Sequence, residues 1–146
     1  MKTRILAVSV FAMMMISTAF ANDIEVNQNV LNAFSEQFTK ASEINWEKTN
    51  SYYKASFQFN GRYLTAFYSE DGEALGVKRN LLTVELPINL QVVLKNKYSD
   101  YWVTELCEYA TNGESNYYIA VENGDQALVL HSSGTSDWSV FSRKSK

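Results

Sequence analysis

Residues 53–68 read YKASFQFNGRYLTAFY, and this stretch decides the fold. On both sides of Asn60-Gly61 every second residue is apolar, which is the pattern of half-buried β-strands. Asn-Gly between two alternating runs strongly predicts a β-hairpin, because a type I′ turn needs positive φ at both of its central positions. We therefore expect a hairpin in which Phe59 lies opposite Arg62.

That register assigns each side chain of the hairpin to one face of the sheet, since successive residues of a strand point to opposite sides. The apolar face is the expected core and carries Tyr53, Ala55, Phe57, Leu64, Ala66 and Tyr68. The other face is polar except for two rings and carries Lys54, Ser56, Gln58, Tyr63, Thr65 and Phe67.

Amphipathic helices are expected before each set of strands. The first has apolar residues at three- and four-residue spacings, namely Val30, Leu31, Phe34, Phe38 and Ala41, and Asn27 or Asn29 is suited to cap it. Pro87, well placed in a first helical turn, opens a second helix whose predicted apolar stripe is Ile88, Leu90, Val93, Leu94 and Tyr98.

Strand patterns resume after the second helix, at about 102–110, 117–122 and 125–131, with a turn expected at Asn123-Gly124. The predicted apolar face of the later hairpin is Tyr117, Ile119, Val121, Leu128 and Leu130. Its other face carries Tyr118, Ala120, Ala127, Val129 and His131, and a last strand contains Trp138, Val140 and Phe141.

The two halves of the chain share one order of features. A helix, a strand, a Thr-Asn turn, an aromatic strand, an Asn-Gly turn and a Gly turn recur at offsets of 62 or 63 residues. This indicates an α+β fold made of a tandem repeat, a helix followed by an antiparallel β-sheet, with both helices packed on one face of the sheet. The expected repeats are residues 24–84 and 85–146 of a single domain, 22–146. A strand near 73–79 is expected too, but its facing depends on whether a Gly bulge is present.

The first 21 residues have the layout of a secretory signal peptide. Lys2 and Arg4 precede an apolar run, and Ala19-Phe20-Ala21 is a small-x-small cleavage site. We expect cleavage after Ala21, the alternative being a retained anchor. No Cys follows to carry a lipid, and no later segment is apolar enough to span a membrane, so a periplasmic or secreted protein is expected. The remaining 125 residues hold 11 basic and 16 acidic side chains, a net charge of −5 that argues against nucleic-acid partners.

The chain has one Cys and one His, which excludes an intramolecular disulfide and metal sites built on Cys or His clusters. Cys107 is expected to be a small strand residue, with a catalytic thiol served by His131 or an intermolecular disulfide as alternatives. His131 is expected to be solvated or hydrogen-bonded, with a pH-sensitive contact as the alternative.

Other catalytic signals are weak. The acidic run at 70–73 suggests a turn rather than a calcium loop, because it lacks the spacing of an EF-hand. There is no phosphate-binding Gly loop, nucleophile elbow or HExxH motif. We therefore expect a protein that is not an enzyme and has no cofactor or metal, a hydrolase with an unmarked carboxylate pair being the minority alternative.

The aromatic residues are the positive signal for function. Residues 22–146 contain 18 aromatic side chains, more than one small core needs. Rings within a polar surround are typical of protein contact surfaces. The predicted binding residues are Tyr63, Phe67, Tyr118, Lys54 and Gln58. The expected partner is a protein or peptide of the cell envelope. The alternative is that another repeat, a loop or a homodimer mate covers this face, as in a structural or oligomerising protein.

The same chain resembles a known family. The residues that carry the resemblance are Phe34, Phe38, Ala41, Ile44, Trp46, 53–57, Asn60-Gly61, 66–68, Asp71-Gly72 and Leu86-Pro87. They resemble the PepSY-like, or β-lactamase-inhibitor-protein-like (BLIP-like), exported proteins of Bacteroidetes. The resemblance implies a two-repeat α+β fold, a periplasmic or outer-surface location and no known catalytic residues. The family name refers to an inhibitor that grips an enzyme with the open face of its sheet. The matched residues are mostly core and turn residues, so no site residue is carried over.

Overall fold

The structure, a computed structural model, describes residues 24–134 and 136–146, so the predicted signal peptide lies outside the described residues. Eight antiparallel strands form one sheet in the order of the chain. Within the described residues, two α-helices and one 3-10 turn accompany them. The elements are α2 (Gln28–Gln37), β1 (Ser42–Lys48), β2 (Tyr53–Phe59), β3 (Arg62–Tyr68), β4 (Ala74–Asn80), η1 (Thr83–Glu85), α3 (Ile88–Lys97), β5 (Trp102–Thr111), β6 (Glu114–Glu122), β7 (Gln126–Ser132) and β8 (Ser139–Ser145).

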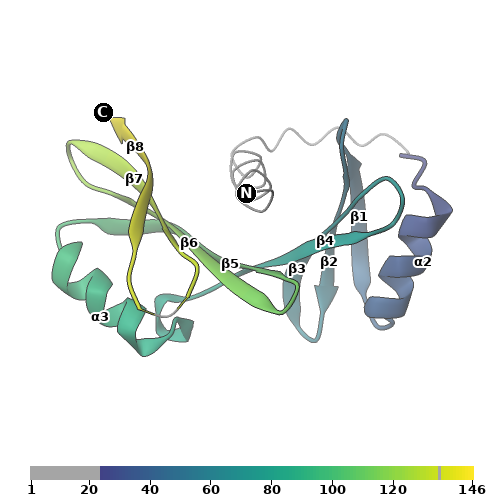
Figure 1. Cartoon of the computed structure of the whole chain (residues 1–146), viewed down its shortest axis with the longest axis horizontal. Coiled ribbons are helices and arrows are strands. Elements are labelled where there is room, and N and C mark those ends of the chain that lie inside the picture. Colours follow the sequence, from purple (N-terminus) through teal and green to yellow (C-terminus); the bar gives the residue numbers. More distant parts are fainter. Residues whose placement is uncertain (1–23, 135) are drawn as a thin grey trace.

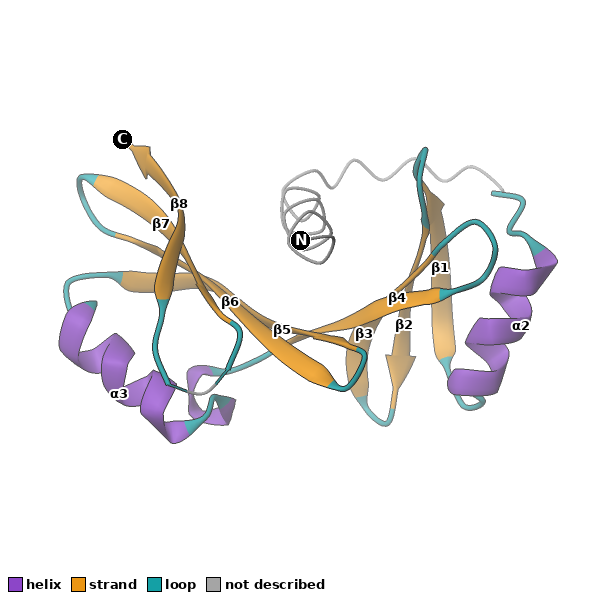
Figure 2. Ribbon diagram, in the orientation of Figure 1, coloured by secondary structure: helices purple, strands orange, loops and turns teal. Residues whose placement is uncertain are grey.

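The molecule has two lobes joined through the middle of the sheet. We call α2 with β1–β4 the first lobe and α3 with β5–β8 the second lobe. The helices lie on the outer side of the two ends, and the sheet curves away from them (Figure 1). The strands β4 and β5 meet in the middle of the sheet and join the two lobes (Figure 2). The α+β class was therefore predicted correctly, and both helices pack on the same face of the sheet.

The hairpin of residues 53–68 forms with the expected register. Phe59 pairs with Arg62, and the pairing continues without interruption to Tyr53 with Tyr68. Asn60 and Gly61 have φ values of 51° and 76°, as a type I′ turn requires.

The core of the first lobe consists of α2 packed on the predicted apolar face of this hairpin. Asn27 caps α2, since its side chain accepts a hydrogen bond from the backbone N–H of Asn29. Phe34 lies at the centre, with ring centroids 4.9 Å from Phe57 and 5.2 Å from Trp46. Rings that meet edge to face at these distances pack more favourably than their buried area alone would give.

The core of the second lobe lies between α3 and β5–β8, and it includes the apolar face predicted for the later strands. Leu90 is fully buried, and the indole Nε1 of Trp138 donates a 3.1 Å hydrogen bond to its carbonyl oxygen. The expectation that Ile88 belongs to this stripe is wrong, because its side chain is 70% exposed. Two residues before Leu90, Ile88 is rotated about 200° around the helix and faces away from the sheet.

The turn expected at Asn123-Gly124 is present, but the strand register across it differs from that of a two-residue turn. Glu122 pairs with Ala127, so Gly124 and Asp125 form the tip, and Asn123 accepts backbone hydrogen bonds from the two residues that follow Gly124. The register differs from the prediction by two residues, which leaves every side chain on its predicted face. The second Asn-Gly turn with positive φ is at residues 112–113, where φ is 50° and 78°.

The middle of the sheet joins the lobes through β4 and β5. Residues 77–80 pair with residues 107–110. The guanidinium of Arg79 forms an ion pair with Glu108, whose other carboxylate oxygen accepts a 2.5 Å hydrogen bond from the Ser115 hydroxyl. Glu108 is buried, and buried carboxylates of this kind are stable only when they are paired.

Candidate binding surface

A cluster of rings lies on the sheet face opposite the helices, and we call it the aromatic floor. Its buried members are Tyr52, Phe67, Cys107, Tyr109, Tyr118 and Val129, with Leu75 and Phe141 packed against them. Both described helices belong to the cores on the other face. The aromatic floor takes residues from both lobes, so it covers the middle of the curved sheet.

Ring contacts hold the floor together. Phe67 lies 5.8 Å from Tyr52 and 5.9 Å from Tyr109, centroid to centroid, and so links the two lobes. Tyr118 lies 5.8 Å from Phe141 and 4.7 Å from the imidazole of His131. Burial raises the pKa of Tyr109 and of Tyr118 to about 12, so both are neutral phenols at physiological pH.

The predicted binding residues all lie on this face, but they differ in exposure. Tyr63 is 66% exposed, and its hydroxyl donates a 2.9 Å hydrogen bond to Glu43. Phe67 and Tyr118 are only 4% and 3% exposed, which agrees with the alternative of a covered face and not with that of exposed rings. The curvature of the sheet brings them against rings from neighbouring strands. Lys54 and Gln58 are partly buried at the margin of the first lobe.

Ion pairs surround the aromatic floor. Lys54 contacts Glu47 at 3.0 Å, Lys78 contacts Glu105 at 3.2 Å, and Lys146 contacts Glu122 at 3.1 Å. Strand pairing places all six side chains on the face of the floor. Charged side chains at the margin of a ring cluster correspond to the polar rim of a protein contact surface, and Leu75 and Phe141 are the partly exposed apolar members of the floor.

Cys107 and His131 do not form a dyad. Cys107 pairs with Tyr118 on β6, and Tyr118 pairs with His131 on β7, so a whole strand separates thiol from imidazole. Neighbouring strands lie about 4.8 Å apart, which puts the two side chains about 10 Å from each other. Burial raises the pKa of the Cys107 thiol to about 11, the opposite of what a nucleophile needs.

His131 is hydrogen-bonded, as expected. Its Nε2 lies 2.9 Å from the side-chain oxygen of Asn116, and the rings of Tyr118 and Phe141 flank it. Burial lowers the pKa of His131, so the imidazole is neutral at physiological pH. A neutral ring that donates from Nε2 satisfies the Asn116 oxygen.

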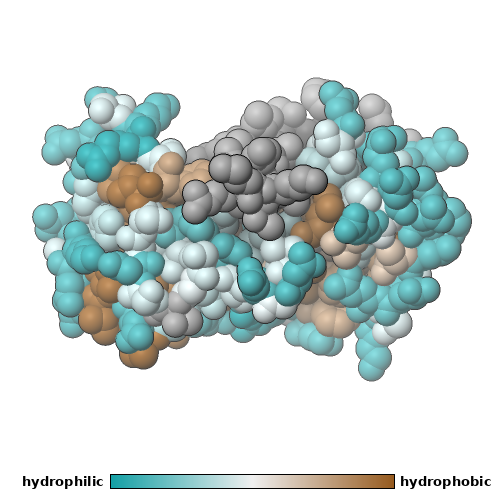
Figure 3. All heavy atoms as spheres, in the orientation of Figure 1, coloured by the Kyte–Doolittle hydropathy of each residue, from teal (hydrophilic) through white to brown (hydrophobic). Residues whose placement is uncertain are grey.

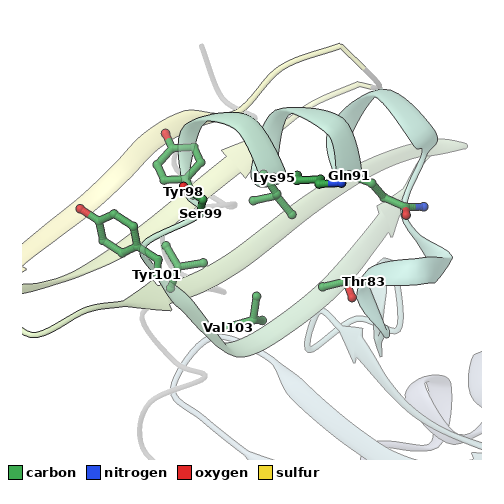
Figure 4. Close-up of a pocket in the computed structure, with 9 residues that line it drawn as sticks. Thr83, Gln91, Lys95, Tyr98, Ser99, Tyr101 and Val103 are labelled. Carbon is green, nitrogen blue, oxygen red and sulfur yellow. The ribbon is translucent and has the colours of Figure 1, made fainter.

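A separate groove of about 400 Å³ opens between α3 and β5. Figure 4 shows Tyr98 and Tyr101 at one end and Gln91 and Thr83 at the other. The ring centroids of Tyr98 and Tyr101 are 5.9 Å apart, and Gln91 donates to the carbonyl oxygen of Leu86 at 2.8 Å. The Gln91 amide is thus already used within the chain, which makes the groove a weaker candidate than the sheet face opposite the helices.

Exposed apolar side chains are scattered. Leu82, Val84 and Ile88 are the most exposed of them, and they lie around η1 and the start of α3. In Figure 3 the brown apolar surface lies in separate patches toward the two ends of the molecule.

Sequence reasoning missed Tyr52 and Tyr109 as members of the aromatic floor. Tyr109 alternates with Cys107 along β5, and that alternation was the available signal. Tyr52 lies in the turn before β2, where alternation gives no information. Among residues 24–134 and 136–146, no three His, Cys, Asp or Glu side chains are grouped to hold a metal ion, and no helix is long and apolar enough to cross a membrane.

No protein-family model and no curated protein matches this sequence. Solved structures with a similar fold are found in Bacteroides. A predicted periplasmic protein from Bacteroides eggerthii matches with a TM-score of 0.73 and 16% identity, covering 84% of this chain and 90% of the other. A BLIP-like protein from Bacteroides fragilis matches with a TM-score of 0.71 and 19% identity, covering 84% and 87%. A DUF2874 family protein from Bacteroides ovatus matches with a TM-score of 0.73 and 16% identity, covering 84% and 89%. The chain therefore has the fold of BLIP-like and DUF2874 proteins.

Proposed function

We propose that the protein is a non-enzymatic, exported binding module that holds a protein or peptide of the cell envelope on the sheet face opposite its helices. The observation that carries this proposal is the aromatic floor, a ring cluster that spans both lobes within a margin of charged side chains. Tyr63, four residues from Phe67 along β3 on the same face, offers an exposed ring, and Lys54 and Gln58 offer polar contacts. Inhibition of an exported hydrolase would be one form of this function.

The non-enzymatic part of the proposal is supported by the chemistry of the same face. Its one thiol is protonated and its one imidazole is a strand away from that thiol. The carboxylates around the floor are held in ion pairs with lysines.

The proposal also includes a periplasmic location, membership of the PepSY-like family and a tandem repeat. A periplasmic location is supported by the predicted signal peptide and by the description of the Bacteroides eggerthii neighbour. Membership of the PepSY-like family and a tandem repeat of one unit are supported by the sequence resemblance and by the occurrence, twice, of a helix followed by four strands.

The experiment is a comparison of surface variants. The purified protein, immobilised, is exposed to an envelope extract, and every retained protein is then tested by titration with the purified chain. We expect Tyr63→Ala to weaken binding at least tenfold. The matched control is Ile88→Ala, which removes a side chain of similar exposure on the helix side and should leave binding unchanged. Equal affinity for the two variants would contradict the proposed face.

The competing function is a structural protein whose open face is buried in a homodimer. Sedimentation over a range of concentrations separates the two functions. A stable dimer that Tyr63→Ala converts to a monomer would replace the partner-binding proposal with the homodimer.

A further inference from the structure

The strand β8 forms one edge of the sheet, because the strand order ends there. Six of its seven residues are exposed. Edge strands carry backbone donors and acceptors that can pair with a further strand. The side chains of β8 therefore determine which further strand can pair with this edge.

The alternation of hydrogen bonds shows which backbone groups of β8 face outward. The N–H of Lys146 donates a 2.9 Å hydrogen bond to the carbonyl oxygen of Asp125 on the β7 side. In an antiparallel ladder, hydrogen-bonded pairs alternate with non-hydrogen-bonded ones. The backbone N–H and C=O of Lys144, two residues earlier, therefore also point to β7. The backbone N–H and C=O of Arg143 and Ser145 point to the outer edge.

Two cationic side chains stand at this edge, one on each face. Arg143 pairs with Leu128, a core residue on the helix side, and Lys144 pairs with Ala127 on the side of the aromatic floor. Both side chains are exposed, and neither makes an ion pair with another residue in the described part of the chain. An added strand would therefore meet positive charge on both of its faces at adjacent positions.

From this we infer that β8 accepts an extended segment of another protein with two adjacent acidic residues, which pairs with the backbone of Arg143 and Ser145. The segment would extend the sheet by one strand, a common mode of peptide recognition. Its two carboxylates would point to opposite faces and each would meet one cation. The same cations repel the β8 edge of a second copy, so the edge selects against itself and in favour of acidic strands.

The other edge of the sheet does not offer this arrangement. The strand β1 has a register shift between Ser42 and Asn45, and Glu43 has a φ of 52° within it. Its acidic side chains are already used, since Glu47 is paired with Lys54 and Glu43 accepts the hydroxyl of Tyr63. The β1 strand of a second copy is therefore less suited than an acidic peptide to pair with β8. Such pairing would make the mass of the protein depend on its concentration.

The test uses a synthetic peptide, acetyl-Thr-Val-Thr-Glu-Asp-Thr-Val-Thr-amide, and a matched peptide with Gln-Asn in place of Glu-Asp. The protein is labelled with ¹⁵N, and amide exchange and affinity are measured by NMR. We expect the acidic peptide to bind at least tenfold more tightly than its control and to slow exchange at Arg143 and Ser145 at least tenfold. The amides of β1 should be unaffected.

Two variants separate strand addition from simple charge attraction. Ser145→Pro removes an outward N–H without breaking a hydrogen bond to β7, so it should weaken binding at least fivefold, whereas Ser145→Ala should not. Arg143→Glu with Lys144→Glu should reverse the preference toward a peptide with Lys-Lys at the same positions.

The proposal is overturned if millimolar acidic peptide leaves the Arg143 and Ser145 amides unprotected, or if Ser145→Pro binds as well as Ser145→Ala. Concentration-dependent mass without peptide that is lost in the double charge variant would assign the edge to a second copy instead. Tyr63→Ala, which tests the binding face of the proposed function, should leave peptide binding at β8 unchanged, so the two proposals can fail separately.

Discussion

Gly76 lies where a side chain of any size would collide with its neighbour. A Cβ built at this position would come within 2.4 Å of the Tyr109 ring, which crosses β4 so that its hydroxyl can donate to the carbonyl oxygen of Leu75. The ring is buried in the aromatic floor and cannot move aside without losing that hydrogen bond.

We therefore expect Gly76→Ala to lower the free energy of unfolding by about 1–3 kcal/mol, the usual cost of forcing extra atoms into a packed site. Gly124→Ala is the control, because nothing lies within 4 Å of its Cβ, and it should change the free energy by less than about 0.5 kcal/mol. Urea denaturation of both variants measures the difference, and equal midpoints would show that the ring moves freely.

His131 makes stability depend on pH in one direction. Burial lowers its pKa in the folded state, so between that value and the unfolded value of about 6.5 the unfolded chain binds more protons. The contribution of the neutral ring is complete above about pH 6.5 and is lost as the pH falls below it. The measurement is the unfolding free energy of the wild type and of His131→Gln from pH 8 to pH 5. Below about pH 6.5 the wild type should lose stability relative to the variant.

At the scale of elements, α2 packs on its sheet through Val30 and Phe34, with Phe38 at its C-terminal end. Phe34 is 4% exposed and contacts rings on β1, β2 and β3 as well as Phe38. We expect Phe34→Ala to cost about 3–5 kcal/mol, because it leaves a cavity that those rings cannot all fill. Glu36→Ala, on the exposed side of α2, should cost less than about 0.5 kcal/mol. Thermal unfolding of both variants checks the contrast.

Some of these elements could be predicted from the sequence and others could not. The register around Asn60-Gly61 was predictable because a type I′ turn fixes both the loop length and the pairing. The register at the turn near residue 123 was not, because Asn123 acts there through its side chain, which alternation does not reveal. Ile88 was misplaced because α3 is apolar on more than one side, so periodicity could not select the face that meets the sheet.

The aromatic floor was only partly predictable for a related reason. Alternation correctly gave the face on which Phe67 and Tyr118 lie. Their burial depends on sheet curvature and on the pairing of β4 with β5, and both arise between segments that are distant in sequence. Tyr63, nearest the Asn60-Gly61 turn, lies beyond these contacts and stays exposed.

At the scale of the whole molecule, the connection between the lobes determines how the protein unfolds. Four residue pairs join β4 to β5, the Arg79–Glu108 ion pair reinforces them, and Phe67 packs on Tyr109 across the same junction. The lobes share one sheet and one aromatic floor, so the loss of either core would expose surface that belongs to both. This coupling favours a single cooperative transition.

Two tryptophans allow that coupling to be measured, because Trp46 packs in the core of the first lobe and Trp138 in the core of the second. One variant keeps only Trp46 and the other keeps only Trp138, with Phe at the remaining two Trp positions. The more stable of the two should be the same whether unfolding is followed by fluorescence or by circular dichroism. Within each variant the two midpoints in urea should coincide. Adding Phe34→Ala to the variant that retains Trp138 should shift the Trp138 transition even though the substitution lies in the other lobe. A Trp138 midpoint that ignores Phe34→Ala would mean that the lobes unfold independently and that the β4–β5 junction transmits little stability between them.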